Sequence, residues 1–482
     1  MAIEKKTVIS SLIYKFTERL AVKGAGLIIG IILARLLLPE EFGQVAIITI
    51  FINLANTIIQ NGFNSALVQQ EEVDEKDYST VFYITTALSA VIVAVLYIIA
   101  PFISVYYESP NLVWPIRVYS FSLFFGAFNS IQVAKMQREM RFKPMMYTSF
   151  IATILSGILG VALAYMDFGI WALVAYGCSN IVFSCITMLF AANWFPKLVF
   201  SWKRAGVLFS FGWKMLVSGI LCSVYNDIRS LIIGKRYSID DLAYYNRGQQ
   251  YPEVISTTID SAIQSVMFPA MARSQNDTAQ MRAMLKRSIS LGAFIITPVM
   301  VGLAAVAHAL ILLLLTEKWL PSVIFMQLIC IAGITFTFMS SSLIAIKALG
   351  RSDIYMKLEI VRRIVMLAIL LTALFVFDSV LAIAISFVFS SYVDMFIAAA
   401  PLKKLLDYDG FAQIKDNWKT LVASLIMGIV VYFVGLLPMN LIALLAVQIV
   451  CGVLVYVLLC ILLKIESFDY VLTMLKGIKN KK

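Results

Sequence analysis

Apolar residues gather into long stretches along the chain, and short polar segments separate one stretch from the next. Each stretch has roughly the 20 residues that a helix needs to cross the hydrocarbon core of a bilayer. The stretches lack the strict alternation of a membrane barrel, so helices are the structure that satisfies their backbone in lipid. The pattern predicts an all-α polytopic membrane protein with about 14 transmembrane helices. The expected spans cover residues 8–37, 42–69, 79–106, 113–134, 144–166, 169–194, 206–235, 241–272, 280–315, 321–347, 352–376, 379–402, 417–436 and 440–463.

The composition agrees with this class and excludes a soluble fold. Of the 482 residues, 61% are hydrophobic and 14% are charged, whereas soluble domains carry about a quarter charged residues. The net charge is +11, but lysine and arginine lie mainly in alternate short loops, which indicates topology and not a nucleic-acid partner. The positive-inside rule then places both chain ends in the cytoplasm.

Other features limit the chemistry. No small-residue cleavage site follows the charged start of the chain, so the first span is expected to remain as an anchor. The six cysteines form no CxxC pair and no Cys/His cluster, so they are expected to pack as small apolar residues. No Walker A sequence is present. We therefore expect a protein that is not an enzyme, with no cofactor and no metal site.

An internal repeat with a shift of 200 residues supports the span count. The segment Pro39-Glu40-Glu41-Phe42-Gly43 recurs as Ile239-Asp240-Asp241-Leu242-Ala243, and Phe63-Asn64-Ser65 aligns with Ile263-Gln264-Ser265. In both copies two acidic residues follow a span and open the next helix, where the helix dipole favours them.

Six spans precede the second copy, so both copies are expected to point the same way across the membrane. This is the parallel arrangement of transporter halves, with a site between them. The predicted domains are an N-terminal lobe of spans 1–6 (1–200), a C-terminal lobe of spans 7–12 (201–405), and spans 13–14 with a basic tail (406–482).

The first span carries an unusual basic stripe. Lys15, Arg19 and Lys23 follow i, i+4, i+8 spacing and share one helix face. Charges inside a span are costly and usually face a cavity or a partner, so we predict a cationic cavity that grips an anion. The alternative is that Lys15 and Arg19 snorkel to the cytoplasmic surface while Glu18 pairs with one of them.

A second basic set completes this predicted site. Lys214 enters the repeat counterpart of the first span, and Arg362 and Arg363 lie in span 11. The i, i+4 spacing of Glu359 and Arg363 favours a structural pair and leaves Arg362 freer. Arginine matches phosphate oxygens with bidentate geometry. The alternative is an internal ion pair near the cytoplasmic end.

Few carboxylates lie inside spans. Glu253 falls near the middle of span 8, where it would bind a proton or sodium, or balance one of the cavity bases. The same two alternatives, ion coupling or charge balance, are predicted for Asp260, Glu18 and Glu359. Asp394 lies in span 12.

The second span is rich in amides. Asn53, Asn56, Gln60 and Asn64 share one face. These side chains either line a sugar path or hydrogen-bond neighbouring helices.

Several segments resemble one transporter family. Residues 32–43 and 62–69 are similar to the start of Wzx-type polysaccharide flippases, members of the multidrug/oligosaccharidyl-lipid/polysaccharide exporter superfamily. Residues 137–142 and 317–319 resemble the colanic acid and teichuronic acid exporter branch. The resemblance covers at least residues 10–400.

The resemblance implies a fold of two six-helix lobes around a cationic cavity, with two extra helices. It implies a bacterial inner-membrane flippase for oligosaccharide repeat units on undecaprenyl pyrophosphate, used in surface or exopolysaccharide assembly. Alternating access without ATP is implied, with a proton or sodium ion, membrane lipids and the pathway's polysaccharide polymerase as further partners. No site residue is transferred, because the family's cavity residues vary.

Two other functions compete with a flippase. A cation-coupled multidrug antiporter on the same fold would favour an acidic cavity, which the basic stripe opposes. A membrane polymerase or ligase usually needs a large extracytoplasmic loop, and no predicted outside loop exceeds about ten residues.

Overall fold

The computed structural model describes residues 5–70 and 73–479. Side chains are described for residues 21–473, apart from residues 61–63, 65, 66, 68, 69, 71, 72, 207, 211 and 214. In this part of the chain the secondary structure is helical throughout, and 11 helices are long and apolar enough to cross a membrane. The all-α membrane class is confirmed, and the chain is a multi-pass membrane protein.

The remaining three of the expected spans also correspond to helices, although they differ from an ideal span. Residues 5–36 form one long helix, residues 113–138 form two consecutive helices, and residues 239–273 form a helix with many polar positions. The predicted count of 14 is therefore approximate.

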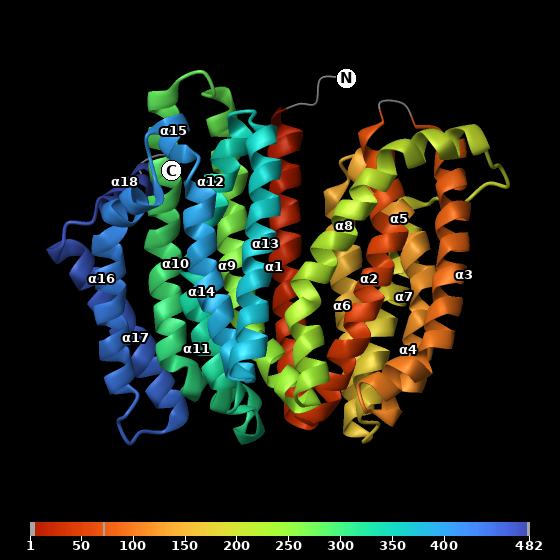
Figure 1. Ribbon diagram of the computed structural model, residues 1–482, viewed down its shortest axis with the longest axis horizontal. Coiled ribbons are helices and arrows are strands. Elements are labelled where there is room, and N and C mark those ends of the chain that lie inside the picture. Colours follow the sequence, from red (N-terminus) through yellow and green to blue (C-terminus); the bar gives the residue numbers. More distant parts are fainter. Residues whose placement is uncertain (1–4, 71–72, 480–482) are drawn as a thin grey trace. The chain divides into compact units, whose positions relative to one another are not determined.

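The first of two compact units is Met1–Ala243. Within it α2 packs along α8, α6 packs on α7 and α1, and α5 packs on α7 (Figure 1). Its helices are α1 (Lys5–Leu36), α2 (Pro39–Gln69), α3 (Glu75–Tyr106), η1 (Pro110–Leu112), α4 (Val113–Ser120), α5 (Ser122–Arg138), α6 (Phe142–Tyr165), α7 (Ile170–Ala192) and α8 (Trp202–Arg236).

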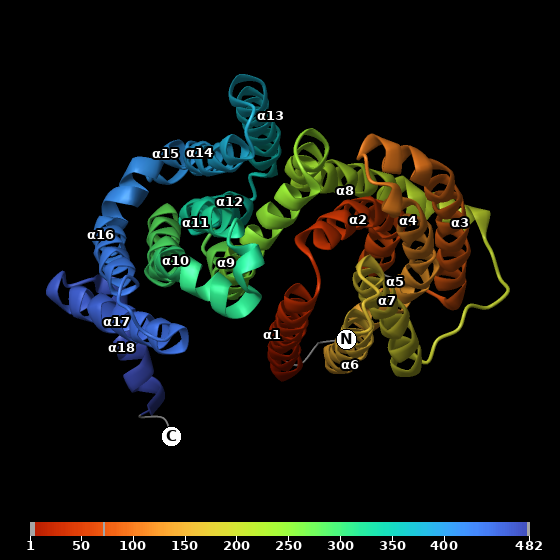
Figure 2. The ribbon, with the colours of Figure 1, turned by 90° about the horizontal axis from the view of Figure 1, so that it is seen from below.

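The second unit is Tyr244–Lys482 and holds most of α9. Seen end-on in Figure 2, α10, α11 and α12 lie inside an arc of α13, α14, α16 and α17. Its helices are α9 (Ile239–Arg273), α10 (Thr278–Leu315), η2 (Glu317–Trp319), α11 (Ser322–Gly333), α12 (Phe336–Ala348), α13 (Ser352–Phe377), α14 (Val380–Ala399), α15 (Leu402–Leu406), α16 (Gly410–Val434), α17 (Leu441–Leu462) and α18 (Glu466–Lys479).

The element order bears out the internal repeat. The break between α1 and α2 spans residues 36–39, and the break between α8 and α9 spans residues 236–239, so the shift is again 200. The third helix of each copy leads into a short 3₁₀ turn and then into a fourth span that is broken into two helices. The amide of Leu38 donates to the Glu41 carboxylate, as the amide of Ser238 donates to Asp241.

The compact units divide at residue 243, although the repeat divides near residue 200. The helix α8 opens the second copy of the repeat but packs along α2 in the first unit. The predicted lobes 1–200 and 201–405 concern the halves that move during transport, and they stay a prediction.

Close packing inside each unit depends on small residues, as in other membrane bundles. A Cβ added to Gly157 on α6 would lie 2.3 Å from Cδ1 of Ile29 on α1. A Cβ on Gly292 of α10 would lie 2.2 Å from Cγ2 of Thr337 on α12. Neither helix pair would approach as closely with a larger side chain.

The tail after span 14 begins as a helix that the sequence interpretation did not foresee. In α18 Phe468 packs near Phe294, and the guanidinium of Arg287 lies 3.6 Å from the ring centroid of Tyr470. These contacts attach the start of the tail to α10.

Candidate functional site

A polar groove lies between α2 and α8, with a volume of about 540 Å³. It is lined by Asn53 and Thr57 from α2 and by Met215, Ser218, Gly219, Cys222, Ser223, Asn226 and Asp227 from α8. All of these residues belong to segments that are apolar enough to span a membrane. Polar groups at such positions usually mark a substrate path.

The stripe on α8 follows from its spacing. Ser218, Cys222 and Asn226 lie at i, i+4, i+8, which puts them on one helix face, and all three are exposed. The asparagine amide bonds back to the Cys222 sulfur at 3.8 Å. Small side chains on this face leave room for the groove.

The amide side chains on one face of α2 lie in two different environments. Asn53 is exposed and lines the groove. The side chain of Gln60 instead donates to Asn56 at 2.9 Å, and Asn56 Oδ1 lies 3.1 Å from where a Cβ on Gly126 of α5 would stand. Asn53 therefore lines the groove, while Asn56 and Gln60 bond to each other within α2.

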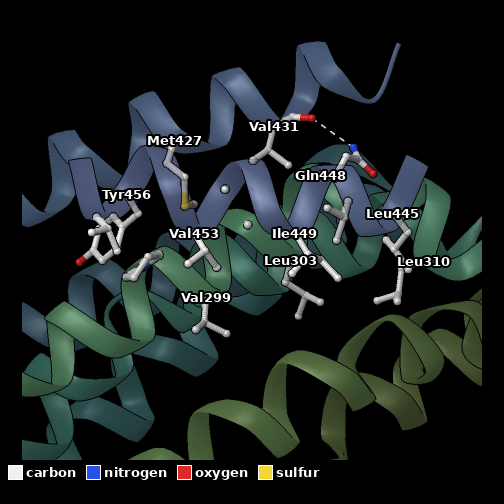
Figure 3. Close-up of a pocket in the computed structure, with 15 residues that line it drawn as sticks. Val299, Leu303, Leu310, Met427, Val431, Leu445, Gln448, Ile449, Val453 and Tyr456 are labelled. Atoms are coloured by element: carbon white, nitrogen blue, oxygen red, sulfur yellow. Dashed lines mark hydrogen bonds between the residues drawn. The ribbon is translucent and has the colours of Figure 1, made fainter. Parts of the chain in front are cut away.

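The second unit has an apolar groove of about 400 Å³ between α10, α16 and α17 (Figure 3). It is lined by Pro298, Val299, Gly302, Leu303, Val306, Leu310, Met427, Val431, Leu445, Gln448, Ile449, Gly452, Val453, Tyr456 and Val457. Ile449 and Val453 are exposed. Gln448 is buried, and its amide donates to the Val431 carbonyl at 3.1 Å (Figure 3).

Most of the predicted cationic stripe falls where no side chain is described. The side chains of Lys15, Arg19 and Lys214, like that of Glu18, lie outside the described residues. Lys23 is described and is exposed on α1. A cationic cavity built from these residues stays a prediction.

In span 11 the expected division of roles between the two arginines is wrong. Arg362 is buried, and its guanidinium Nη2 donates to Asp394 on α14 at 2.7 Å while Nε donates to the other carboxylate oxygen. Its Nη1 donates to Glu359 at 2.7 Å. Arg363 does lie near Glu359, at 3.6 Å, but is more exposed. The tertiary partner Asp394, which no local spacing predicts, makes Arg362 the structural residue.

The two carboxylates of α9 occupy different environments. Glu253 is exposed and accepts a hydrogen bond from Gln249 at 3.1 Å. Asp260 is only 8% exposed and accepts from Ser340 at 2.7 Å and from Gln264 at 3.2 Å. Their roles in ion coupling or charge balance stay predictions.

One arginine inside the expected span 241–272 is buried. Arg247 is buried in α9, its guanidinium lies 5.0 Å from the ring centroid of Trp319, and it donates to Gln250 at 2.6 Å. It contributes to the packing of the second unit.

Comparison with known families settles membership. A family described as "polysaccharide biosynthesis protein" matches residues 32–324, which is more than half of the chain. The chain belongs to this family. The resemblance to polysaccharide transporters that its sequence carries is thereby confirmed.

Two relatives of this chain are bacterial proteins. Teichuronic acid biosynthesis protein TuaB of Bacillus subtilis (strain 168) is 24% identical over 306 residues, covering 62% of this chain and 62% of that protein. Succinoglycan biosynthesis transport protein ExoT of Rhizobium meliloti (strain 1021) is 25% identical over 288 residues, covering 60% and 58%. The match spans about three fifths of the length of each relative.

The fold of this chain matches the solved structure of a flippase. The structure of the lipid II flippase MurJ, in an inward closed conformation, matches with a TM-score of 0.75 and 15% identity, covering 95% of this chain and 99% of that one. At this identity the match establishes the fold alone.

The residues missed at first are the polar positions of α8. The prediction for span 7 names Lys214 alone, although its sequence also holds the i, i+4, i+8 stripe of Ser218, Cys222 and Asn226. Small and weakly polar residues do not interrupt a hydropathy pattern, so this stripe does not stand out from the apolar span.

Proposed function

We propose that this chain moves oligosaccharide repeat units, linked to undecaprenyl pyrophosphate, from the cytoplasmic to the outer leaflet of the bacterial inner membrane. The observation that carries the proposal is the polar groove between α2 and α8. Amide and hydroxyl groups such as Asn53, Ser218 and Asn226 offer donors and acceptors at membrane depth. A volume of about 540 Å³ falls in the range of ligand sites.

The apolar groove supports the lipid half of this substrate. Its walls are aliphatic apart from Gln448, Met427 and Tyr456. A polyprenyl chain is kept out of water equally well by such a surface and by lipid tails. A tail can therefore stay at the membrane-facing side of the protein while the sugar moves along polar groups.

The predicted basic residues would hold the pyrophosphate of the substrate. Lys15, Arg19, Lys23, Lys214 and Arg363 remain candidates on charge and spacing. Arg362 is a weaker candidate, because each of its three guanidinium nitrogens already donates to Asp394 or Glu359. The excess of lysine and arginine in alternate loops supports a cytoplasmic position for both termini.

A multidrug antiporter on the same fold is less well supported. The two relatives named above are described by polysaccharide biosynthesis or transport. The polar groove has one carboxylate, Asp227, among amides and hydroxyls. Such a lining suits sugar hydroxyls better than an apolar organic cation.

A deletion strain tests the proposal when lipid-linked intermediates and surface polymer are assayed together. We expect polymer to be lost and intermediates to accumulate on the cytoplasmic leaflet. Intermediates that reach the outer leaflet normally would contradict the flippase.

Two matched variants connect the transport to the groove. Ser218→Trp places a large ring in the groove and should lower polymer export strongly at normal protein level. Val217→Trp is the control, because Val217 is exposed beside Ser218 but does not line the groove. Equal export by the two variants would remove the groove from the path.

A further inference from the structure

The segment that joins α7 to α8 exposes large apolar side chains outside the membrane spans. It lies between the span formed by α7 and the span that begins within α8. Leu198 is 96% exposed, Trp202 82% and Phe195 60%. Apolar side chains that are exposed together, away from a span, usually mark an interaction surface.

Hydrogen bonds attach this segment to the beginning of α3. The backbone amide of Lys197 donates to Ser79 Oγ at 3.0 Å, and its carbonyl accepts from the Tyr83 hydroxyl at 3.2 Å. The amide of Ser201 donates to Thr80 Oγ1 at 3.2 Å. Figure 2 shows the segment at the edge of the first unit, outside α3. These bonds satisfy backbone groups of a non-helical segment, which lipid tails cannot do.

The contacts with α3 place the segment at the level of the bilayer interface. Residues 78–106 of α3 carry no charge, and at 1.5 Å per residue they are about 43 Å long. The hydrocarbon core is about 30 Å thick, so the uncharged part of α3 extends beyond it. Ser79, Thr80 and Tyr83 follow directly after the charged residues 75–77. The segment bonded to them therefore lies where headgroups meet acyl chains.

The two tryptophans of this stretch have opposite environments. Trp194 is 3% exposed, and its Nε1 donates to Glu75 of α3 at 3.0 Å. Trp202 packs edge-on against Phe200, with ring centroids 4.9 Å apart, and most of its surface is exposed. Tryptophan is enriched at membrane–water interfaces, because its ring is apolar and its N–H is polar. Trp194 thus attaches the segment to the protein, while Trp202 faces outward.

The charges of the segment suit an anionic surface. Lys197 and Lys203 are both exposed. The neighbouring Arg204 instead lies 3.5 Å from Asp74 and 3.1 Å from Asp77, so its charge is used within the protein. Basic residues next to a bilayer are attracted by anionic headgroups, with about 1 kcal/mol for each lysine or arginine.

We propose that residues 195–203 form an interfacial anchor that binds anionic phospholipids of the surrounding membrane. Leu198 and Trp202 insert among the lipids of one leaflet. Lys197 and Lys203 lie beside the headgroup phosphates. Because the segment joins the two copies of the repeat, this contact ties the link between them to the bilayer. The anchor does not depend on what the chain transports.

Brominated lipids test the insertion in the full-length protein, reconstituted into vesicles of phosphatidylcholine and phosphatidylglycerol. Bromine near the carboxyl end of the acyl chains quenches a tryptophan that lies among lipids, whereas iodide quenches one that water reaches. The emission lost in Trp202→Phe isolates Trp202, and the emission lost in Trp194→Phe isolates the buried control. We expect brominated lipid, and not iodide, to quench the Trp202 emission, and neither to quench that of Trp194.

Two results would overturn the proposal. One is quenching of Trp202 by iodide without quenching by brominated lipid. The other is protection of Trp202 from both quenchers, as a covering protein would give. If a tryptophan variant does not fold, Leu198→Trp decides the matter, because it adds a reporter at the most exposed position of the segment. Its added emission should be quenched by brominated lipid, and quenching by iodide alone would equally overturn the anchor.

The preference for anionic lipid is tested in vesicles with equal amounts of the two phospholipids, of which only one is brominated. Brominated phosphatidylglycerol should quench Trp202 more strongly than brominated phosphatidylcholine. Lys197→Gln combined with Lys203→Gln should remove this difference. Lys403→Gln combined with Lys404→Gln, which changes two exposed lysines of the second unit, should keep it. Equal quenching by the two lipids in the wild type, or a difference that survives in the first pair, would overturn the role of the two lysines.

Discussion

Arg362 of α13 and Asp394 of α14 form a buried, two-pronged ion pair, with Nη2 of the arginine 2.7 Å from Oδ2 of the aspartate. Glu359 adds a second carboxylate at 2.7 Å from Nη1. Burial weakens the competition from water, so each charge depends on the others. This group joins two helices of the second unit.

Removing one member of this group should destabilise the protein strongly. Arg362→Gln leaves Asp394 buried without its cation, and the expected loss of stability is about 3–5 kcal/mol. Thermal unfolding of the purified protein measures it. Arg363→Gln is the matched control and should cost less than about 1 kcal/mol, because that arginine is more exposed and lies 3.6 Å from Glu359. A similar loss of stability in both variants would show that the buried pair stabilises the protein no more than the exposed one.

A second prediction concerns the contact between α9 and α11. A Cβ on Gly248 would lie 2.8 Å from the backbone nitrogen of Met326 and 2.9 Å from the backbone oxygen of Ser322. Backbone atoms cannot turn away as a side chain does, so Gly248→Ala should cost about 1–3 kcal/mol. Gly206→Ala is the control, since no described atom lies within 4 Å of its added Cβ, and it should stabilise α8 by up to about 1 kcal/mol. If the two variants unfolded at the same midpoint, the close packing at Gly248 would be contradicted.

The fold was largely predictable because span length and loop charge are local properties. The repeat seen in residues 39–43 and 239–243 located two helix starts correctly. The breaks inside the spans at Phe121 and at Ile334-Thr335 were not predicted, because the residues around them remain apolar. Hydropathy cannot distinguish one long helix from two short ones in line.

The site was harder to predict than the fold, because partners from distant helices decide what a charged residue does. Arg362 is paired with Asp394, which is 32 residues away in sequence. Ser340 reaches Asp260 across 80 residues. Spacing on one helix describes the face that a residue occupies, but not the helix that packs against that face.

Cys222 offers a direct test of whether water enters the polar groove. It is exposed in the groove, whereas Cys185, Cys330 and Cys460 are buried. A thiol reacts as the thiolate, which needs water around it, so Cys222 should be the first cysteine modified by a membrane-impermeant maleimide. Mass spectrometry of the labelled protein identifies the site, and Cys222→Ala should lose the fast reaction. Labelling of Cys222 that is no faster than labelling of the buried Cys185, Cys330 and Cys460 would contradict water access to this groove.

The last prediction concerns the segment that joins the two copies of the repeat. Arg204 at the start of α8 lies 3.5 Å from Asp74 and 3.1 Å from Asp77 at the start of α3. The backbone amide of Asp77 holds the pKa of Asp74 below its ordinary value of 3.8, and the side chain of Asp77 and the charge of Arg204 act in the same direction. Near neutral pH these contacts are intact.

A lowered pKa means that this contribution to stability is fully present above pH 3.8 and is lost as the pH falls through the folded-state value. Hydrogen exchange of residues 193–206 should therefore stay slow as the pH is lowered to about 4 and quicken below it, after correction for the intrinsic exchange rate. Arg204→Gln removes one cause of the shift, so the quickening should begin at a higher pH. Arg351→Gln, which breaks an exposed pair with Asp353 in the second unit, should leave this segment unchanged. An onset in Arg204→Gln that matches the wild type would mean that the arginine does not hold the segment to α3.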